Sequence, residues 1–131
     1  MAEILSNEQT EDYHDMGYLV LERHLPDDIL IKIRAEISRF EDEARGMTES
    51  NERLDLEDSH TIEDPRLRRI KLPHKISNFM RELMFSDRIL APARDLAGPD
   101  LRLHTSKLNI KSAGYVSAVE WHADYGIYPH T

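Results

Sequence analysis

The sequence predicts an α+β chain in which helices come first and strands begin only towards the carboxyl-terminal end. Three observations lead to this class: a capped helical pattern near the start, apolar residues at helical spacing through the middle, and an alternating segment over residues 101–110. With 131 residues, 40% of them hydrophobic, the chain has the size and composition of about one folded domain.

The first predicted helix begins at a capping box. Ser6 is followed three residues later by Gln9, so each side chain is placed to bond the backbone of the other. Gly17 suits the left-handed position that ends a helix. Residues 18–21 (YLVL) are rich in strand-forming side chains and predict a short strand.

Pro26 and Asp27 indicate the start of the second helix. The apolar side chains that recur at helical spacing along it are Ile29, Ile33, Ile37 and Phe40. From residue 41 to about residue 71 the periodicity disappears among acidic and basic residues. We expect a long surface connection there, either a plain solvated excursion or a lid that faces the substrate.

Helical spacing returns over residues 76–84, and Ser86 predicts the cap of a further helix that ends at Gly98. Pro92 lies inside that helix and predicts a kink or two short turns. Residues 101–110 alternate as a strand does, and a turn at residues 112–114 leads into a second strand over residues 115–121.

Composition and charge exclude several classes of function. The formal net charge of −8 argues against a nucleic-acid or anionic-membrane partner, and we interpret the basic residues 66–71 as a solvated loop. No apolar run approaches the roughly 20 residues of a membrane span, and residues 1–4 do not begin a signal peptide. We therefore expect a cytoplasmic protein. The chain has no cysteine, so any metal ligands must be His, Asp or Glu.

The most informative motif is His122 and Asp124, two residues apart. In an extended segment both side chains project to the same side, where one divalent metal ion can take an imidazole nitrogen and a carboxylate oxygen. This pair is two-thirds of the 2-His-1-carboxylate triad of non-heme Fe(II) oxygenases. The alternative is a turn in which Asp124 caps the backbone and His122 is incidental.

Three segments in this order resemble the phytanoyl-CoA dioxygenase (PhyH-like) family of Fe(II)/2-oxoglutarate-dependent oxygenases. They are residues 13–28, which contain YHDMGYLVL and LPDD, residues 95–111, which contain DLAGPDL and SKLNIK, and residues 121–130, which contain WHADY and YPH. The family commonly has Trp-His-Gln-Asp in the last segment, and Ala123 replaces the Gln here. The resemblance covers nearly the whole chain.

The resemblance implies a double-stranded β-helix, the cupin-like jelly roll, with helices packed outside it. Residues 1–131 then form the N-terminal portion of one dioxygenase domain. The helical layer takes up about residues 1–98, and the first strands of an incomplete barrel take up about residues 99–131. In the family a second His ligand and an Arg that pairs with 2-oxoglutarate come later in the sequence.

The resemblance also implies Fe(II), 2-oxoglutarate and O2 as the reactants that hydroxylate a small organic substrate. His122 and Asp124 are the expected metal ligands and catalytic residues. Lys107 and Asn109 share one face of the preceding strand, where they are placed to bond the 2-oxoglutarate; the alternative for Lys107 is a position in solvent. Trp121 and Tyr125 flank the ligands, either as walls of the site or as core side chains.

Two other functions remain open on the sequence alone. One is a truncated, non-catalytic module that binds a partner or dimerises. The other is a cupin-like metal protein in which His130 is the third ligand. The expected partners are a small-molecule substrate and the remainder of the same domain or a second copy of the chain. The histidines without metal-like spacing, which we expect at the surface or in hydrogen bonds, are His14, His24, His60, His74 and His104.

Overall fold

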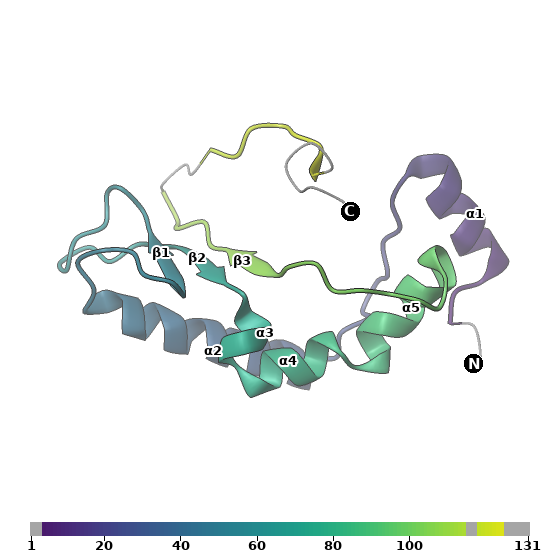
Figure 1. The fold of residues 1–131 in the computed structure, drawn as a ribbon, viewed down its shortest axis with the longest axis horizontal. Helices are drawn as coiled ribbons and strands as arrows, with labels where there is room; N and C mark the ends of the chain where they lie inside the picture. Colours follow the sequence, from purple (N-terminus) through teal and green to yellow (C-terminus); the bar gives the residue numbers. More distant parts are fainter. Residues whose placement is uncertain (1–3, 115–117, 125–131) are drawn as a thin grey trace.

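The computed structural model describes residues 4–114 and 118–124. Within these ranges the chain mixes helices with one open, three-stranded antiparallel sheet in the order β1-β2-β3. In Figure 1, α2 lies below the sheet and the segment that follows β3 arches above it. The elements in chain order are α1 (Asn7–Met16), α2 (Asp27–Arg45), β1 (Leu54–Leu56), β2 (Leu67–Lys71), α3 (Pro73–Ile76), α4 (Asn78–Met84), α5 (Asp87–Ala97) and β3 (Lys107–Asn109).

The two ends of α1 are those that the sequence predicts. The Ser6 hydroxyl accepts a hydrogen bond from the Gln9 N–H at 3.2 Å, and the Gln9 side chain accepts one from the Ser6 N–H at 3.0 Å. The helix ends at Gly17, whose φ of 80° is a left-handed conformation that glycine adopts without a steric penalty. The capping box and the glycine stop are both confirmed.

The strand predicted over residues 18–21 is wrong, because these residues form neither helix nor strand. Tyr18 and Val20 are exposed. Strand-forming side chains produce a strand only where a neighbouring strand pairs with them and one face is buried. This segment instead connects α1 to α2.

The apolar stripe of α2 faces the rest of the molecule, as its spacing predicts. Ile29, Ile33 and Ile37 are half-buried, and Phe40 is fully buried. Asp27 and Asp28 in the first turn complement the positive end of the helix dipole. α2 has 19 residues, yet no helix in the part of the chain that the structure describes is long and apolar enough to cross a membrane.

The main core lies where we expected a surface connection. Residues 41–71 complete α2 and then form the hairpin of β1 and β2, which packs against the end of α2. The expectation of a plain solvated excursion is therefore wrong. The buried core residues are Phe40, Ala44, Leu54, Leu56, Leu67 and Ile70.

An irregular register hides this hairpin from the sequence pattern. Leu54 pairs with Ile70, but Leu56 pairs with Leu67, so Arg68 is an extra residue in β2. The two buried residues of β2 are consequently three positions apart instead of two or four. A β-bulge of this kind breaks the period of two by which a half-buried strand is recognised.

His60 fastens the loop between β1 and β2 to the end of α2. Its Nε2 lies 2.8 Å from the Met47 carbonyl, and its Nδ1 accepts the Arg66 N–H at 2.8 Å. Both bonds are satisfied when the ring is neutral and carries its proton on Nε2. The loop is thus tied down at two points, which agrees with a hydrogen-bonded rather than metal-binding histidine.

α5 runs unbroken through Pro92, so the predicted pair of short turns is wrong. Proline lacks the N–H that would bond the carbonyl four residues earlier, which belongs to Arg88. That carbonyl instead accepts a bond from His24 Nε2 at 2.6 Å, and Arg88 Nη1 donates to the His24 carbonyl at 2.8 Å. The predicted start at Ser86 and end at Gly98 are confirmed.

The strand predicted over residues 101–110 is shorter in the structure, because only β3 pairs with β2. Over residues 107–110 the predicted division of its faces is confirmed. Leu108 and Ile110 pack against the core, whereas Lys107 and Asn109 are exposed on the opposite face. The turn at Ala113 and Gly114 is also present.

Candidate functional site

His122 and Asp124 lie in a segment that has no strand pairing. Residues 118–121 form neither helix nor strand, so the predicted strand is wrong over that part, and residues 115–117 lie outside the described residues. The pair therefore does not project from the end of a paired strand. It lies in the segment that arches over the sheet in Figure 1.

The two side chains nevertheless face each other. His122 Nε2 lies 3.2 Å from Asp124 Oδ1, and His122 Nδ1 lies 2.7 Å from the Glu120 carbonyl. A carbonyl oxygen only accepts, so the proton of a neutral ring belongs on Nδ1 and the Nε2 lone pair points to the carboxylate. This is also the geometry of an ion pair when the imidazole is protonated.

The donor pair fits a divalent metal ion. Histidine nitrogens and carboxylate oxygens bind such metals at about 2.0–2.2 Å, so two donors at a right angle are about 3.0 Å apart. The separation of 3.2 Å is close to that value. Metal-binding histidines commonly donate their second ring N–H to a backbone carbonyl, as His122 does here.

The described residues supply this pair and no larger donor set. Residues 4–114 and 118–124 contain no group of three or more His, Cys, Asp or Glu that can hold a metal ion. His130, the rival third ligand, and Tyr125, a candidate wall, both lie outside the described residues. A metal site built on this pair therefore needs at least one more ligand.

Trp121 is fully exposed, which excludes a core-packing role for it in this structure. Together with Val119, Glu120 and His122 it lines a hollow of about 310 Å³. Among the residues that the structure describes, the lining comes from one short stretch of chain. The hollow is therefore an open surface beside His122 rather than an enclosed substrate pocket.

Lys107 and Asn109 lie together on the exposed face of the sheet, in the positions that strand alternation predicts. Asn109 pairs in register with Arg69, and Arg69 Nε donates to Asn109 Oδ1 at 3.1 Å. Lys107 pairs in register with Lys71. Figure 1 shows β3 at the edge of the sheet and the segment of residues 118–124 apart from it, so the structure forms each pair but does not bring the two pairs together.

Sequence reasoning missed the residues of β1 and β2 that share this face. We interpreted residues 66–71 as a solvated loop, yet Arg69 and Lys71 point from the sheet and both pair with Asp55. The available signal was Ile70 between two basic residues, a short stretch of alternation. The bulge at Arg68 interrupts it.

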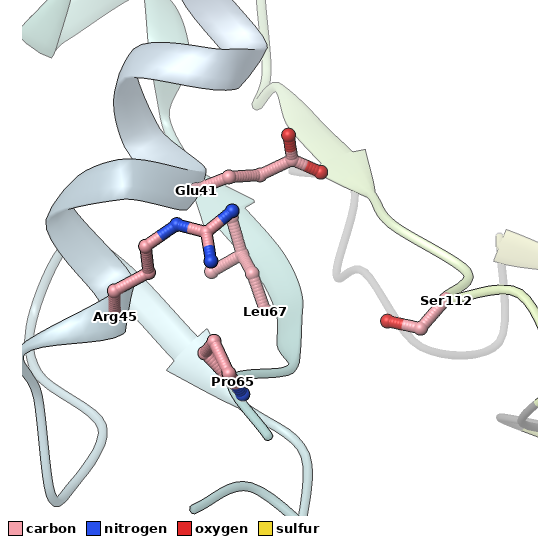
Figure 2. Close-up of a pocket in the computed structure, with 5 residues that line it drawn as sticks. All are labelled: Glu41, Arg45, Pro65, Leu67 and Ser112. Atoms are coloured by element: carbon pink, nitrogen blue, oxygen red, sulfur yellow. The ribbon is translucent and has the colours of Figure 1, made fainter. Parts of the chain in front are cut away.

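Figure 2 shows a separate pocket, which opens between α2, the start of β2 and the segment after β3. Glu41 and Arg45 project into it from α2, and the Ser112 hydroxyl points toward it from the opposite side. Its volume is about 140 Å³. Small-molecule sites usually measure about 300–1,000 Å³, so this pocket is too small for an organic substrate.

The chain matches known proteins over almost its whole length. Residues 13–131 match the phytanoyl-CoA dioxygenase (PhyH) family. The chain is 32% identical over 124 residues to a protein of Stutzerimonas stutzeri described as a "Probable alpha-ketoglutarate-dependent hypophosphite dioxygenase"; the match covers 95% of this chain and 43% of that protein. It is 26% identical over 118 residues to the ectoine dioxygenase of Streptomyces avermitilis, covering 88% of this chain and 37% of the relative.

A third relative is the ectoine dioxygenase of Bordetella parapertussis, which is 25% identical over 124 residues. That match covers 95% of this chain and 38% of the relative. The chain thus spans about two fifths of the length of these relatives. The matched region includes every element from α2 to β3 and the segment of His122 and Asp124.

Proposed function

Because this chain belongs to the phytanoyl-CoA dioxygenase (PhyH) family, we propose that it acts as part of an Fe(II)/2-oxoglutarate-dependent dioxygenase. Residues 1–131 form the N-terminal portion of the catalytic domain. The sheet of β1, β2 and β3 is the beginning of a jelly roll, and α1 to α5 form the helical layer outside it. The remaining metal ligand and the arginine that binds 2-oxoglutarate come from the rest of that domain.

His122 and Asp124 are the metal ligands that this chain contributes. The observation that carries the assignment is the 3.2 Å separation of Nε2 and Oδ1, with Nδ1 bonded to the Glu120 carbonyl. Fe(II), when bound, supplies the activation of O2 that oxidises 2-oxoglutarate and the substrate together. His122 must be neutral and Asp124 ionised to bind, so metal affinity falls in acid.

Lys107 and Asn109 contribute hydrogen-bond donors for the 2-oxoglutarate. A lysine ammonium offers three donors and an asparagine amide offers two, which match carboxylate and keto oxygens. Their shared position on the exposed face of β3 supports this role.

The substrate that we propose is a small polar molecule. The relatives act, by their names, on hypophosphite and ectoine, one an inorganic oxyanion and the other a small organic compound. Residues 4–114 and 118–124 hold an apolar hollow of about 320 Å³ beside α5, but it is remote in sequence from His122 and Asp124. We therefore expect residues outside this chain to complete the substrate site.

The test is an anaerobic Fe(II) titration, with and without 2-oxoglutarate, on the longest expressible chain that contains residues 1–131, and on its variants. We expect the visible charge-transfer absorption of a chelated keto acid in the wild type, and its loss in His122→Ala and Asp124→Ala, because either change removes one ligand. Glu120→Gln is the matched control, since it removes a neighbouring carboxylate and leaves the carbonyl that His122 uses.

Substrate-dependent consumption of 2-oxoglutarate is measured on the same variants. Full turnover in His122→Ala or Asp124→Ala would remove that residue from the site. His130→Ala separates the dioxygenase from the cupin-like alternative: retained Fe(II) binding supports a distant third ligand, and lost binding supports His130. If the wild type binds neither Fe(II) nor 2-oxoglutarate, the dioxygenase proposal is wrong for this protein.

A further inference from the structure

The outer edge of β1, on the side away from β2, can be located from the two residues that flank the strand. The Arg53 carbonyl accepts the Lys71 N–H at 2.8 Å, and the Glu57 N–H donates to the Arg66 carbonyl at 2.9 Å. In an antiparallel pair the backbone groups of successive residues alternate between the partner strand and the other side. The residues next to Arg53 and Glu57 within β1 therefore direct their N–H groups to the outer edge of the sheet.

Leu54 and Leu56 are these two residues, and Ser50 and Asn51 bond to them along that edge. Asn51 Oδ1 accepts the Leu54 N–H at 2.8 Å, and the Leu54 carbonyl accepts the Asn51 N–H at 2.9 Å. Ser50 Oγ accepts the Leu56 N–H at 2.9 Å. Leu54 and Leu56 are buried, where an N–H without a partner costs free energy. The chain thus satisfies the outer edge of β1 with its own side chains.

The loop over residues 47–51, which carries these two side chains, is held at both ends. The Met47 carbonyl lies 2.8 Å from His60 Nε2, and Asn51 Oδ1 also accepts the Arg53 N–H at 2.8 Å. These contacts keep the loop folded back along β1. A strand that joins β1 from outside needs the same edge groups for its own hydrogen bonds, so the loop has to leave before such a strand can bind.

We propose that Ser50 and Asn51 form an edge cap, an autoinhibitory contact that prevents a second copy of this chain from pairing with β1. An edge strand with open N–H and C=O groups is a template for another strand. Two uncapped copies of β1 would present the same groups to each other across a two-fold axis. Within the described residues the strand order ends at β1 and at β3, so the edge cap directs strand addition to β3. This role is independent of the proposed dioxygenase chemistry.

Hydrogen exchange of the backbone amides, followed by NMR of the nitrogen-15-labelled 131-residue chain at low concentration, tests whether the outer edge is occupied. We expect the Leu54 and Leu56 amides of the wild type to exchange slowly. In the double variant Ser50→Ala and Asn51→Ala both should exchange about tenfold faster or more, because their acceptors are removed. The Glu57 amide, which bonds toward β2, should stay slow in both proteins.

A spin label tests whether a second copy pairs with the opened edge. The chain has no cysteine, so Glu52→Cys places a single label at an exposed residue beside β1. The spin-labelled copy is mixed with a nitrogen-15-labelled copy that carries no spin label. When both copies carry the double variant, the label should broaden the β1 amides of the other copy. When both have the wild-type residues at positions 50 and 51, these amides should stay sharp.

Conservative variants separate the edge cap from a general effect on the loop. Ser50→Thr with Asn51→Asp keeps both acceptors and should behave as the wild type does, and so should Thr48→Ala, which removes a neighbouring exposed hydroxyl. If circular dichroism shows that the double variant does not fold, Ser50→Ala alone opens the Leu56 N–H and is measured in the same two ways.

Two results would overturn the proposal. One is rapid exchange of the Leu54 and Leu56 amides in the wild type, because the outer edge would then be open already. The other is a double variant that broadens the β1 amides of the other copy no more than the wild type does, whether or not its own amides exchange faster. In that case Ser50 and Asn51 protect the amides of β1 without excluding a second copy.

Discussion

Histidines in this chain differ in function because their ring nitrogens have different partners. His122 leaves Nε2 directed at the Asp124 carboxylate, whereas His60 bonds two backbone groups and His24 bonds one. A ring whose nitrogens are both committed cannot ligate a metal without breaking those bonds. The two backbone partners of His60 therefore separate it from the candidate ligand His122.

His74 is the residue that should make stability depend on pH. It is buried, its Nδ1 lies 2.6 Å from the Ser106 hydroxyl, and burial lowers its pKa, aided by Lys75 and Arg81. The unfolded chain, with the ordinary pKa of 6.5, binds this proton more readily, so stability falls as the pH drops. The contribution of His74 to the free energy of unfolding is complete above pH 6.5. It is lost as the pH falls from 6.5 through the lowered pKa that His74 has in the folded protein.

Urea unfolding from neutral pH to about pH 5 measures this effect. His74→Gln should flatten the dependence in that window, because glutamine does not titrate. His14→Gln, an exposed substitution on α1, is the control and should leave the slope of the wild type. If the free energy of unfolding changes with pH equally in the wild type, His74→Gln and His14→Gln, then His74 does not govern the acid sensitivity. Glu36, whose pKa is lowered by its bond to Arg39, acts only in more acidic solution.

At the scale of elements, α5 shows how a distant side chain keeps a proline-containing helix intact. Removing His24 should cost about 0.5–1.5 kcal/mol, because the Arg88 carbonyl loses its donor at a partly exposed site. In the Pro92→Ala background residue 92 regains an N–H that can bond the same carbonyl, so His24→Ala should cost less there.

A double-mutant cycle of His24→Ala and Pro92→Ala, read by urea unfolding, measures this coupling. A matched control replaces His14 by Ala in both backgrounds, since His14 is exposed on α1 and outside this contact. If the changes in the free energy of unfolding for His24→Ala and Pro92→Ala are additive, His24 does not act through the Arg88 carbonyl, which has no helical donor because residue 92 is proline.

Local signals explain which elements were predictable from the sequence. The capping box of Ser6 and the glycine stop of α1 involve residues a few positions apart, so the sequence pattern was sufficient. The apolar spacing of α2 and the faces of β3 were predictable for the same reason. The hairpin was not, because β1 has three residues and the bulge at Arg68 breaks the alternation of β2.

The candidate site was predictable only in part. The two-residue spacing of His122 and Asp124 indicated a shared ion, and their facing side chains are consistent with that prediction. Asp55 and Arg69 were not predictable, because their contacts depend on a register between strands that are distant in sequence. Non-local pairing of this kind leaves no short-range pattern in the sequence.

At the scale of the whole molecule, the arrangement leaves apolar surface uncovered. β1 and β3 each pair on one side within the described residues, but both are only three residues long, so their free edges are short. The larger exposed feature is the hollow of about 320 Å³ beside α5, whose lining includes Phe85, Leu101 and Leu103. All three are exposed, and such a surface is typical of a contact with another part of a protein.

We expect the 131-residue chain, expressed alone, to associate in a concentration-dependent manner through this hollow. The double variant Phe85→Ser and Leu101→Ser should reduce association, because it replaces apolar lining with polar groups while the core of Phe40, Leu54 and Ile70 stays unchanged. Sedimentation velocity over a range of concentrations measures the effect, and circular dichroism verifies that the variant keeps its helices. Val20→Ser, at an exposed residue outside the hollow, should associate as the wild type does. A wild-type chain that remains monomeric and unfolds in one sharp transition would contradict this expectation.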